Sequence, residues 1–113
     1  MSNVASYLLF LTLLAGCAAP HIAGVSITGE KFAVSESDIR AAIAASEEYA
    51  EVMSKRADVC IDYGHLAHFR VTAVNVINHN EMHIYRRPTD VTWVYVIRKD
   101  GRWESDGFGY IDR

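Results

Sequence analysis

The stretch VSESDIRAAIAASEEYAEVMSKRADVC, residues 34–60, decides the fold, because its apolar residues recur with the period of an α-helix. Ser35 is placed to cap this helix, and Asp38 three residues later can complete a capping box. The residues that share one helical face are Ile39, Ala42, Ile43, Ser46, Tyr49, Ala50, Met53, Ala57 and Cys60. The pattern predicts a helix from about Ser35 to Val59 whose small residues let it dock closely on a sheet. The alternative is that this face is an exposed groove for a partner.

After Gly64 the apolar residues change to a period of two, which is typical of β-strands. Strands are predicted at about residues 69–77, 82–85 and 91–97, and the last of these is dense in β-branched and aromatic residues. An earlier strand is expected before the helix, around residues 25–27 or 32–34.

The dipeptide Asp-Gly at residues 100–101 indicates a hairpin between the last two strands, because glycine tolerates a positive φ angle. A two-residue turn would place Trp93 opposite Phe108. A three-residue loop would instead place Arg98 opposite Arg102, which is unfavourable for two like charges. We therefore expect the two-residue turn.

The order of elements is thus a first strand, one long helix and four strands in a meander. It predicts a single α+β domain over residues 25–113, with the helix packed on a four- to five-stranded antiparallel sheet.

This order of elements is similar to that of the cystatin fold. It is also similar to the shorter half of NTF2-like domains, in which hairpins with the sequence DGRW are frequent. The resemblance covers about residues 24–111. Cystatin inhibitors carry a Gln-x-Val-x-Gly loop and a Pro-Trp pair, and neither occurs here, so the resemblance does not imply inhibition of cysteine proteases.

The stretch LLFLTLLAGC, residues 8–17, is apolar but too short to cross a bilayer, which takes roughly 20 apolar residues. Its length suits a secretory signal peptide. The tetrapeptide Leu14-Ala15-Gly16-Cys17 resembles the lipobox of bacterial lipoproteins. The resemblance implies cleavage before Cys17, acylation of that cysteine and a membrane anchor. Ala18 after the cysteine implies delivery to the outer membrane, facing the periplasm.

This interpretation divides the chain into a signal peptide of residues 1–16, a lipidated tether of residues 17–24 and the α+β domain. The alternative is that the apolar stretch is a buried first element of the core.

The formal net charge is −3 and no block of basic residues occurs, which argues against binding to nucleic acid. With Cys17 acylated, Cys60 has no second cysteine in its chain to pair with, so it is buried or pairs between chains. We favour burial.

Two histidines and a carboxylate are the residues that suggest a metal site. On a strand, His79, Glu81 and His83 would project to one face and could together bind zinc. The alternative, which we favour, is that Asn-His-Asn at residues 78–80 is a turn that directs His79 away from His83.

Complete catalytic motifs are missing from the sequence. There is no Gly-x-Ser-x-Gly elbow. The spacing of Gly24 and Gly29 resembles that of a phosphate loop, but Glu30 stands where the lysine is required. The remaining carboxylates near turns are expected to be solvated: Asp62, Asp100, Glu104 and Asp106. We therefore predict no catalytic, cofactor-binding or metal-binding residue, and Cys17 as the site of lipidation.

Three classes of function follow. The first, which we favour, is a lipid-anchored binding or assembly module without catalysis that meets another envelope protein, through an open sheet edge or the basic strand ends at Arg86, Arg87 and Arg98. The second is a domain that binds a small ligand, which a cavity of roughly 300 Å³ or more between helix and sheet would favour. The third is a metal-dependent enzyme that uses the histidine cluster. The sequence does not predict the oligomeric state.

Overall fold

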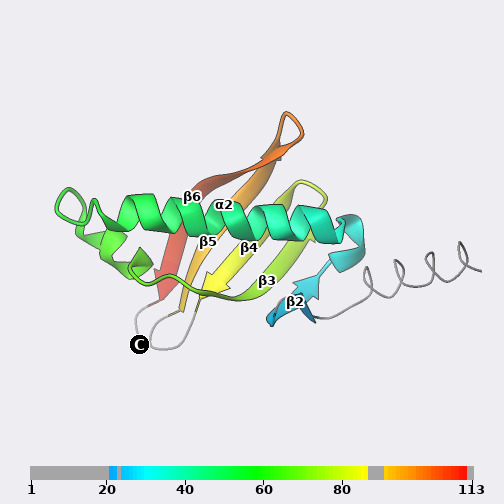
Figure 1. Cartoon of the computed structure of the whole chain (residues 1–113), viewed down its shortest axis with the longest axis horizontal. Helices are drawn as coiled ribbons and strands as arrows, with labels where there is room; N and C mark the ends of the chain where they lie inside the picture. The colour runs from blue at the N-terminus through cyan, green and yellow to red at the C-terminus, as the bar shows by residue number, and fades with distance from the viewer. Residues whose placement is uncertain (1–20, 23, 87–90, 112–113) are drawn as a thin grey trace, which may run out of the picture.

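The computed structural model describes residues 21–22, 24–86 and 91–111 (Figure 1). The expected signal peptide, Cys17 and Arg87 lie outside the described residues. The elements in chain order are β1 (His21–Ile22), β2 (Val25–Gly29), the 3-10 helix η1 (Lys31–Ala33), α2 (Glu36–Ser54), the 3-10 helix η2 (Ile61–Leu66), β3 (Val71–Asn78), β4 (Glu81–Arg86), β5 (Val91–Lys99) and β6 (Arg102–Ile111).

The described residues form two layers, with helix α2 lying across one face of a sheet (Figure 1). The sheet has the strand order β1-β2-β3-β4-β5-β6, in which β1 has only two residues. The predicted α+β class, one long helix on a sheet, is confirmed. The expectation of an entirely antiparallel sheet is wrong, because β2 and β3 are parallel, with Ser26 beside Ala73. The helix between them returns the chain to the edge from which β2 started, as in a βαβ crossover.

Helix α2 begins as predicted. The Ser35 hydroxyl accepts a hydrogen bond from the Asp38 backbone N–H (3.1 Å), and the Asp38 carboxylate accepts one from the Ser35 N–H (3.0 Å). The buried residues of the helix are Ile39, Ala42, Ser46 and Ala50, all members of the predicted face. The small side chains among them let the helix lie close to the sheet.

The helix ends at Ser54, earlier than the predicted Val59. The Arg56 N–H donates to the Met53 carbonyl (2.9 Å), a tighter bond between residues three apart, and it closes the last turn. Val59 is consequently 70% exposed. Cys60 is half-buried rather than buried, since the helical face ends before reaching it.

The core lies between α2 and the helix-facing side of the sheet. The sheet residues that are almost completely buried there are Val74, Val76, Met82, Ile84, Thr92, Val94 and Val96. They alternate along β3, β4 and β5, as a sheet with one covered face requires. Leu66 from η2 is also buried in this core.

The hairpin between β5 and β6 has the predicted two-residue turn: Lys99 pairs with Arg102, and both residues 100 and 101 have positive φ angles (53° and 77°). The predicted pairing of Trp93 with Phe108 is wrong by one residue. The register shifts between Val94 and Val96, so that Trp93 pairs with Gly109 instead. This shift is a β-bulge.

The bulge changes which residues of β6 face the helix. Before the bulge, the Trp103 indole donates to Asp38 (3.1 Å) and the Ser105 hydroxyl donates to the Ala45 carbonyl (2.9 Å). After the bulge, Phe108 pairs with the buried Val94 and Tyr110 with the buried Thr92. Without the extra residue, the glycines at positions 107 and 109 would take the places of these two aromatic rings.

The folded part of the chain begins before the predicted boundary at residue 25. His21 and Ile22 form β1 and pair with Ser26 and Val25 of β2. Ile22 is only 4% exposed and belongs to the core, so the expected tether of residues 17–24 is wrong at its C-terminal end.

Candidate binding groove

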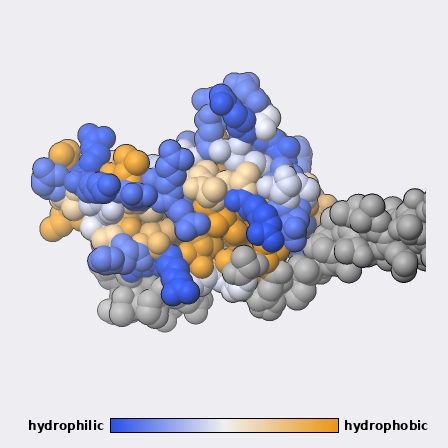
Figure 2. All heavy atoms as spheres, in the orientation of Figure 1, coloured by the Kyte–Doolittle hydropathy of each residue, from blue (hydrophilic) through white to orange (hydrophobic). Residues whose placement is uncertain are grey.

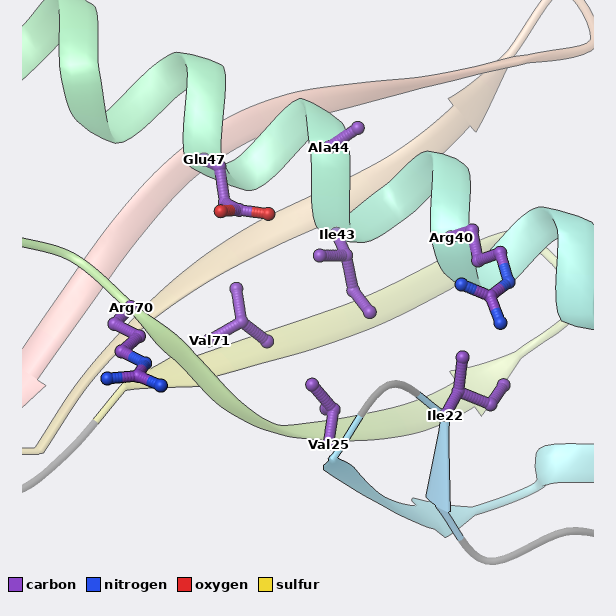
Figure 3. Close-up of a pocket in the computed structure, with 8 residues that line it drawn as sticks. All are labelled: Ile22, Val25, Arg40, Ile43, Ala44, Glu47, Arg70 and Val71. Carbon is purple, nitrogen blue, oxygen red and sulfur yellow. The ribbon is translucent and has the colours of Figure 1, made fainter.

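An apolar groove of about 310 Å³ runs between helix α2 and the β1–β3 side of the sheet (Figure 3). We call it the α2–β3 groove. It is lined by Ile22, Val25, Arg40, Ile43, Ala44, Glu47, Arg70 and Val71. Figure 2 shows apolar surface exposed on this side of the helix, with hydrophilic side chains at its borders.

The position of the helix leaves the groove open. Within the sheet, helix α2 packs mainly against β6 and β5 and less against β3 and β4. Figure 1 shows β2 beside the helix rather than beneath it. The side chains of Ile22 and Val25 therefore form a floor without a helix directly above them, while Ile43 and Val71 are half-buried at the walls. Truncating Ile43 should for this reason cost less than truncating a fully buried isoleucine such as Ile39.

The charged residues of the groove lie at its two ends. Figure 3 shows Arg40 at one end, and Arg70 with Glu47 toward the other. The Arg40 guanidinium is 3.6 Å from Glu36, but both side chains are largely exposed (56% and 43%), so this ion pair is weak. Arg70 is also exposed. The groove thus offers an apolar centre with a guanidinium group at each end, and Glu47 adds one opposing charge near Arg70. Two guanidinium groups against one carboxylate suit an occupant with an apolar middle and anionic ends.

Sequence reasoning missed this site, although the helix carried a signal. Arg40, Ile43, Ala44 and Glu47 recur at i, i+3, i+4 and i+7, and form a stripe beside the fully buried face. The partners of this stripe come from β1, β2 and the start of β3, which the sequence alone does not place next to it.

A second surface of interest is the open face of the sheet, opposite the helix. Tyr95 lies at the centre of an aromatic row there: its ring packs edge-on against His83 (4.8 Å between centroids) and Trp93 (6.3 Å). Tyr85 lies 5.8 Å from Trp93 on the other side. Trp93 and Tyr95 are both half-buried on this open face.

The histidine cluster is only partly assembled. His83 Nε2 and Glu81 Oε2 are 2.7 Å apart on the open face. His79 lies in the turn between β3 and β4, where its Nε2 is 3.1 Å from the Asn80 amide nitrogen. In the described part of the chain, no three His, Cys, Asp or Glu side chains are grouped so that they could hold a metal ion.

The basic strand ends are used inside the fold. The Arg86 guanidinium donates to the Ala67 carbonyl. Arg98 forms an ion pair with Asp38 (3.1 Å) and lies over the Trp103 ring at 4.7 Å. These contacts make Arg86 and Arg98 poor candidates for the partner surface that the sequence suggested.

No family model, curated protein or solved structure matches this chain. None of the helices in the described ranges is both long enough and apolar enough to cross a membrane.

Proposed function

We propose that the protein is a lipid-anchored, non-catalytic binding module of the cell envelope, held on the outer membrane through Cys17 and facing the periplasm. Its α2–β3 groove binds an extended segment of another envelope protein, one with an apolar centre and acidic residues on both sides. The observation that carries this proposal is the apolar floor of the groove between Arg40 and Arg70.

The chemistry of the groove supports binding rather than catalysis. Among the described residues, its lining contains no serine, cysteine or histidine that could form a pair of nucleophile and base. Arginine is among the residues that contribute most at protein interfaces, because its planar guanidinium can pair with a carboxylate through two hydrogen bonds. The apolar floor would contribute through burial of the partner's central side chain.

A second candidate function is binding of a small amphipathic anion in the same groove. The volume of about 310 Å³ supports it, since it reaches the lower end of the range for small-molecule sites, roughly 300–1,000 Å³. An anionic amphiphile that co-purifies with the protein and is lost on Arg70→Glu, without a protein partner, would favour this function.

The proposal is tested by site-specific photo-crosslinking of the full chain in intact cells. A benzophenone side chain at Ala44, which lines the groove, should capture one discrete envelope protein. The same side chain at Ala41, exposed on the same helix but outside the groove, should not. Mass spectrometry should place the crosslink in a segment with an apolar centre and flanking Asp or Glu.

Charge reversal distinguishes specific capture from proximity. Arg70→Glu should weaken capture at Ala44 roughly tenfold, as expected for loss of an important interface arginine. Arg56→Glu, an exposed charge in the turn after α2, is the matched control and should leave capture unchanged. Equal capture at both alanines, or capture that does not respond to Arg70→Glu, would contradict the proposal.

A further inference from the structure

The 3-10 helix η1, between β2 and α2, presents a large apolar side chain to solvent. Phe32 is 74% exposed, although it belongs to an ordered turn in which the Ala33 N–H donates to the Glu30 carbonyl (2.9 Å). The Lys31 ammonium lies 5.8 Å from the centre of the Phe32 ring. Surfaces that lie in the membrane interface combine Trp, Phe or Leu side chains with lysine or arginine.

The strand pairing shows which end of the molecule the preceding chain leaves from. β1 is antiparallel to β2, with His21 beside Ser26 and Ile22 beside Val25. The start of β1 therefore points toward the end of β2, and η1 follows directly after that end. Cys17 precedes His21 by four residues, which span at most roughly 14 Å even when fully extended. A lipid on Cys17 would thus hold the η1 end of the domain close to the bilayer.

The other large apolar side chains exposed in the described residues lie elsewhere. They are Val52, Val59, Ile61 and Ile111, on the second half of α2, after it, or at the end of β6. Among these five residues, Phe32 is the one at the end where the chain leads back to Cys17.

We propose that Phe32 enters the headgroup boundary of the bilayer that carries the lipid anchor, with the Lys31 ammonium at the anionic headgroups. This inference rests on the proposed acylation of Cys17. Binding at the membrane interface strengthens with the apolar area that is buried there and with the attraction of basic residues to anionic lipids. Glu30 is an opposing charge in the same segment, so the ring makes the main contact and the lysine the lesser one. The contact also orients the domain, because it adds a second attachment point to the lipid anchor.

The experiment uses the full-length lipidated protein in vesicles of phosphatidylethanolamine and phosphatidylglycerol that contain a lipid with brominated acyl chains. Bromine quenches indole fluorescence on contact. Phe32→Trp introduces an indole at the proposed contact, and Ile61→Trp is the matched control, since Ile61 is 85% exposed and follows the other end of α2. Trp93 and Trp103 give the same background in all proteins.

We expect the brominated lipid to quench the fluorescence of the indole introduced at position 32, and its emission maximum to shift to the blue. The indole introduced at position 61 should show neither change beyond the wild-type background. Lys31→Glu in the Phe32→Trp protein should reduce the quenching. A protein that floats with the vesicles while Phe32→Trp is quenched no more than Ile61→Trp would overturn the inference and leave the anchor intact. Failure of the protein to float would overturn the proposed anchor itself, and with it this inference.

Discussion

Asp38 connects three parts of the molecule through one carboxylate. It completes the capping box with Ser35, accepts a hydrogen bond from the Trp103 indole and pairs with Arg98. Burial alone would raise the pKa of this carboxyl group, but the hydrogen bonds from Ser35 and Trp103 and the charge of Arg98 together lower it below its ordinary value of 3.8. The ionised form therefore stabilises the folded state.

We predict that Asp38→Asn lowers the free energy of unfolding at pH 7 by about 1 to 3 kcal/mol, through loss of the cap and of the charged hydrogen bonds. Because the pKa of Asp38 is lowered on folding, its contribution is complete above the unfolded value near 3.8 and disappears as the pH falls through the lower folded value. Urea unfolding at several pH values should show a stability loss below about pH 4 in the wild type that is smaller in Asp38→Asn. Asp58→Asn, in the exposed turn after α2, is the control and should lose as much stability in acid as the wild type does. If Asp38→Asn also lost as much stability in acid as the wild type, the assignment would be contradicted.

At the scale of elements, the β-bulge in β6 decides which side chains of the last strand face the core. Gly107 lies in the bulge with a φ angle of 114°, and no atom lies within 4 Å of the position a Cβ would take. The glycine is required by its backbone conformation rather than by lack of space. The bulge also lets the Trp93 ring lie over Gly109, where a Cβ would be 2.5 Å from the ring.

We predict that Gly107→Ala destabilises the domain by roughly 1 to 3 kcal/mol, the cost of a backbone conformation that L-residues rarely adopt. Gly64→Ala is the matched control, because Gly64 is exposed, has equal space around it and does not have a positive φ angle. It should change the stability by less than about 0.5 kcal/mol. Chemical unfolding monitored by tryptophan fluorescence measures both; equal midpoints for the two variants would show that the bulge does not need a glycine.

At the scale of the whole molecule, one proposed contact site lies before the start of helix α2 and the other lies along its side. Its 19 residues span about 28 Å at the usual rise per residue. The η1 end, with Phe32, lies where the chain leads back to Cys17, and the α2–β3 groove runs along the side of the helix. An anchored domain in this arrangement would hold the groove within reach of other proteins on the same membrane.

We predict that Cys17→Ser releases the protein from the membrane fraction or stops its maturation, because the thiol that would carry the lipid is lost. Cys60→Ser should leave the membrane fraction unchanged, since Cys60 is a half-buried residue of the folded domain. Cell fractionation followed by immunoblotting distinguishes the two. Equal membrane retention of Cys17→Ser and the wild type would contradict the anchor.

The features that could be predicted from the sequence depend on residues close together in the chain. The capping box joins Ser35 to Asp38 across one helical turn, and the hairpin turn needs only the positive φ angles of residues 100 and 101. The periods of the apolar residues likewise indicated the helix and the strands, because each face must be buried against another layer.

Only the tertiary structure decided the features that depend on distant contacts. The parallel pairing of Ser26 with Ala73 and the bulge opposite Tyr95 each depend on the position of a neighbouring strand. The candidate groove belongs to the same class, since its walls come from α2 and β3 and its floor from β1 and β2. The local propensity of a segment does not determine which other segment it pairs with. That pairing depends on the burial of apolar surface between segments that meet only when the whole chain has folded.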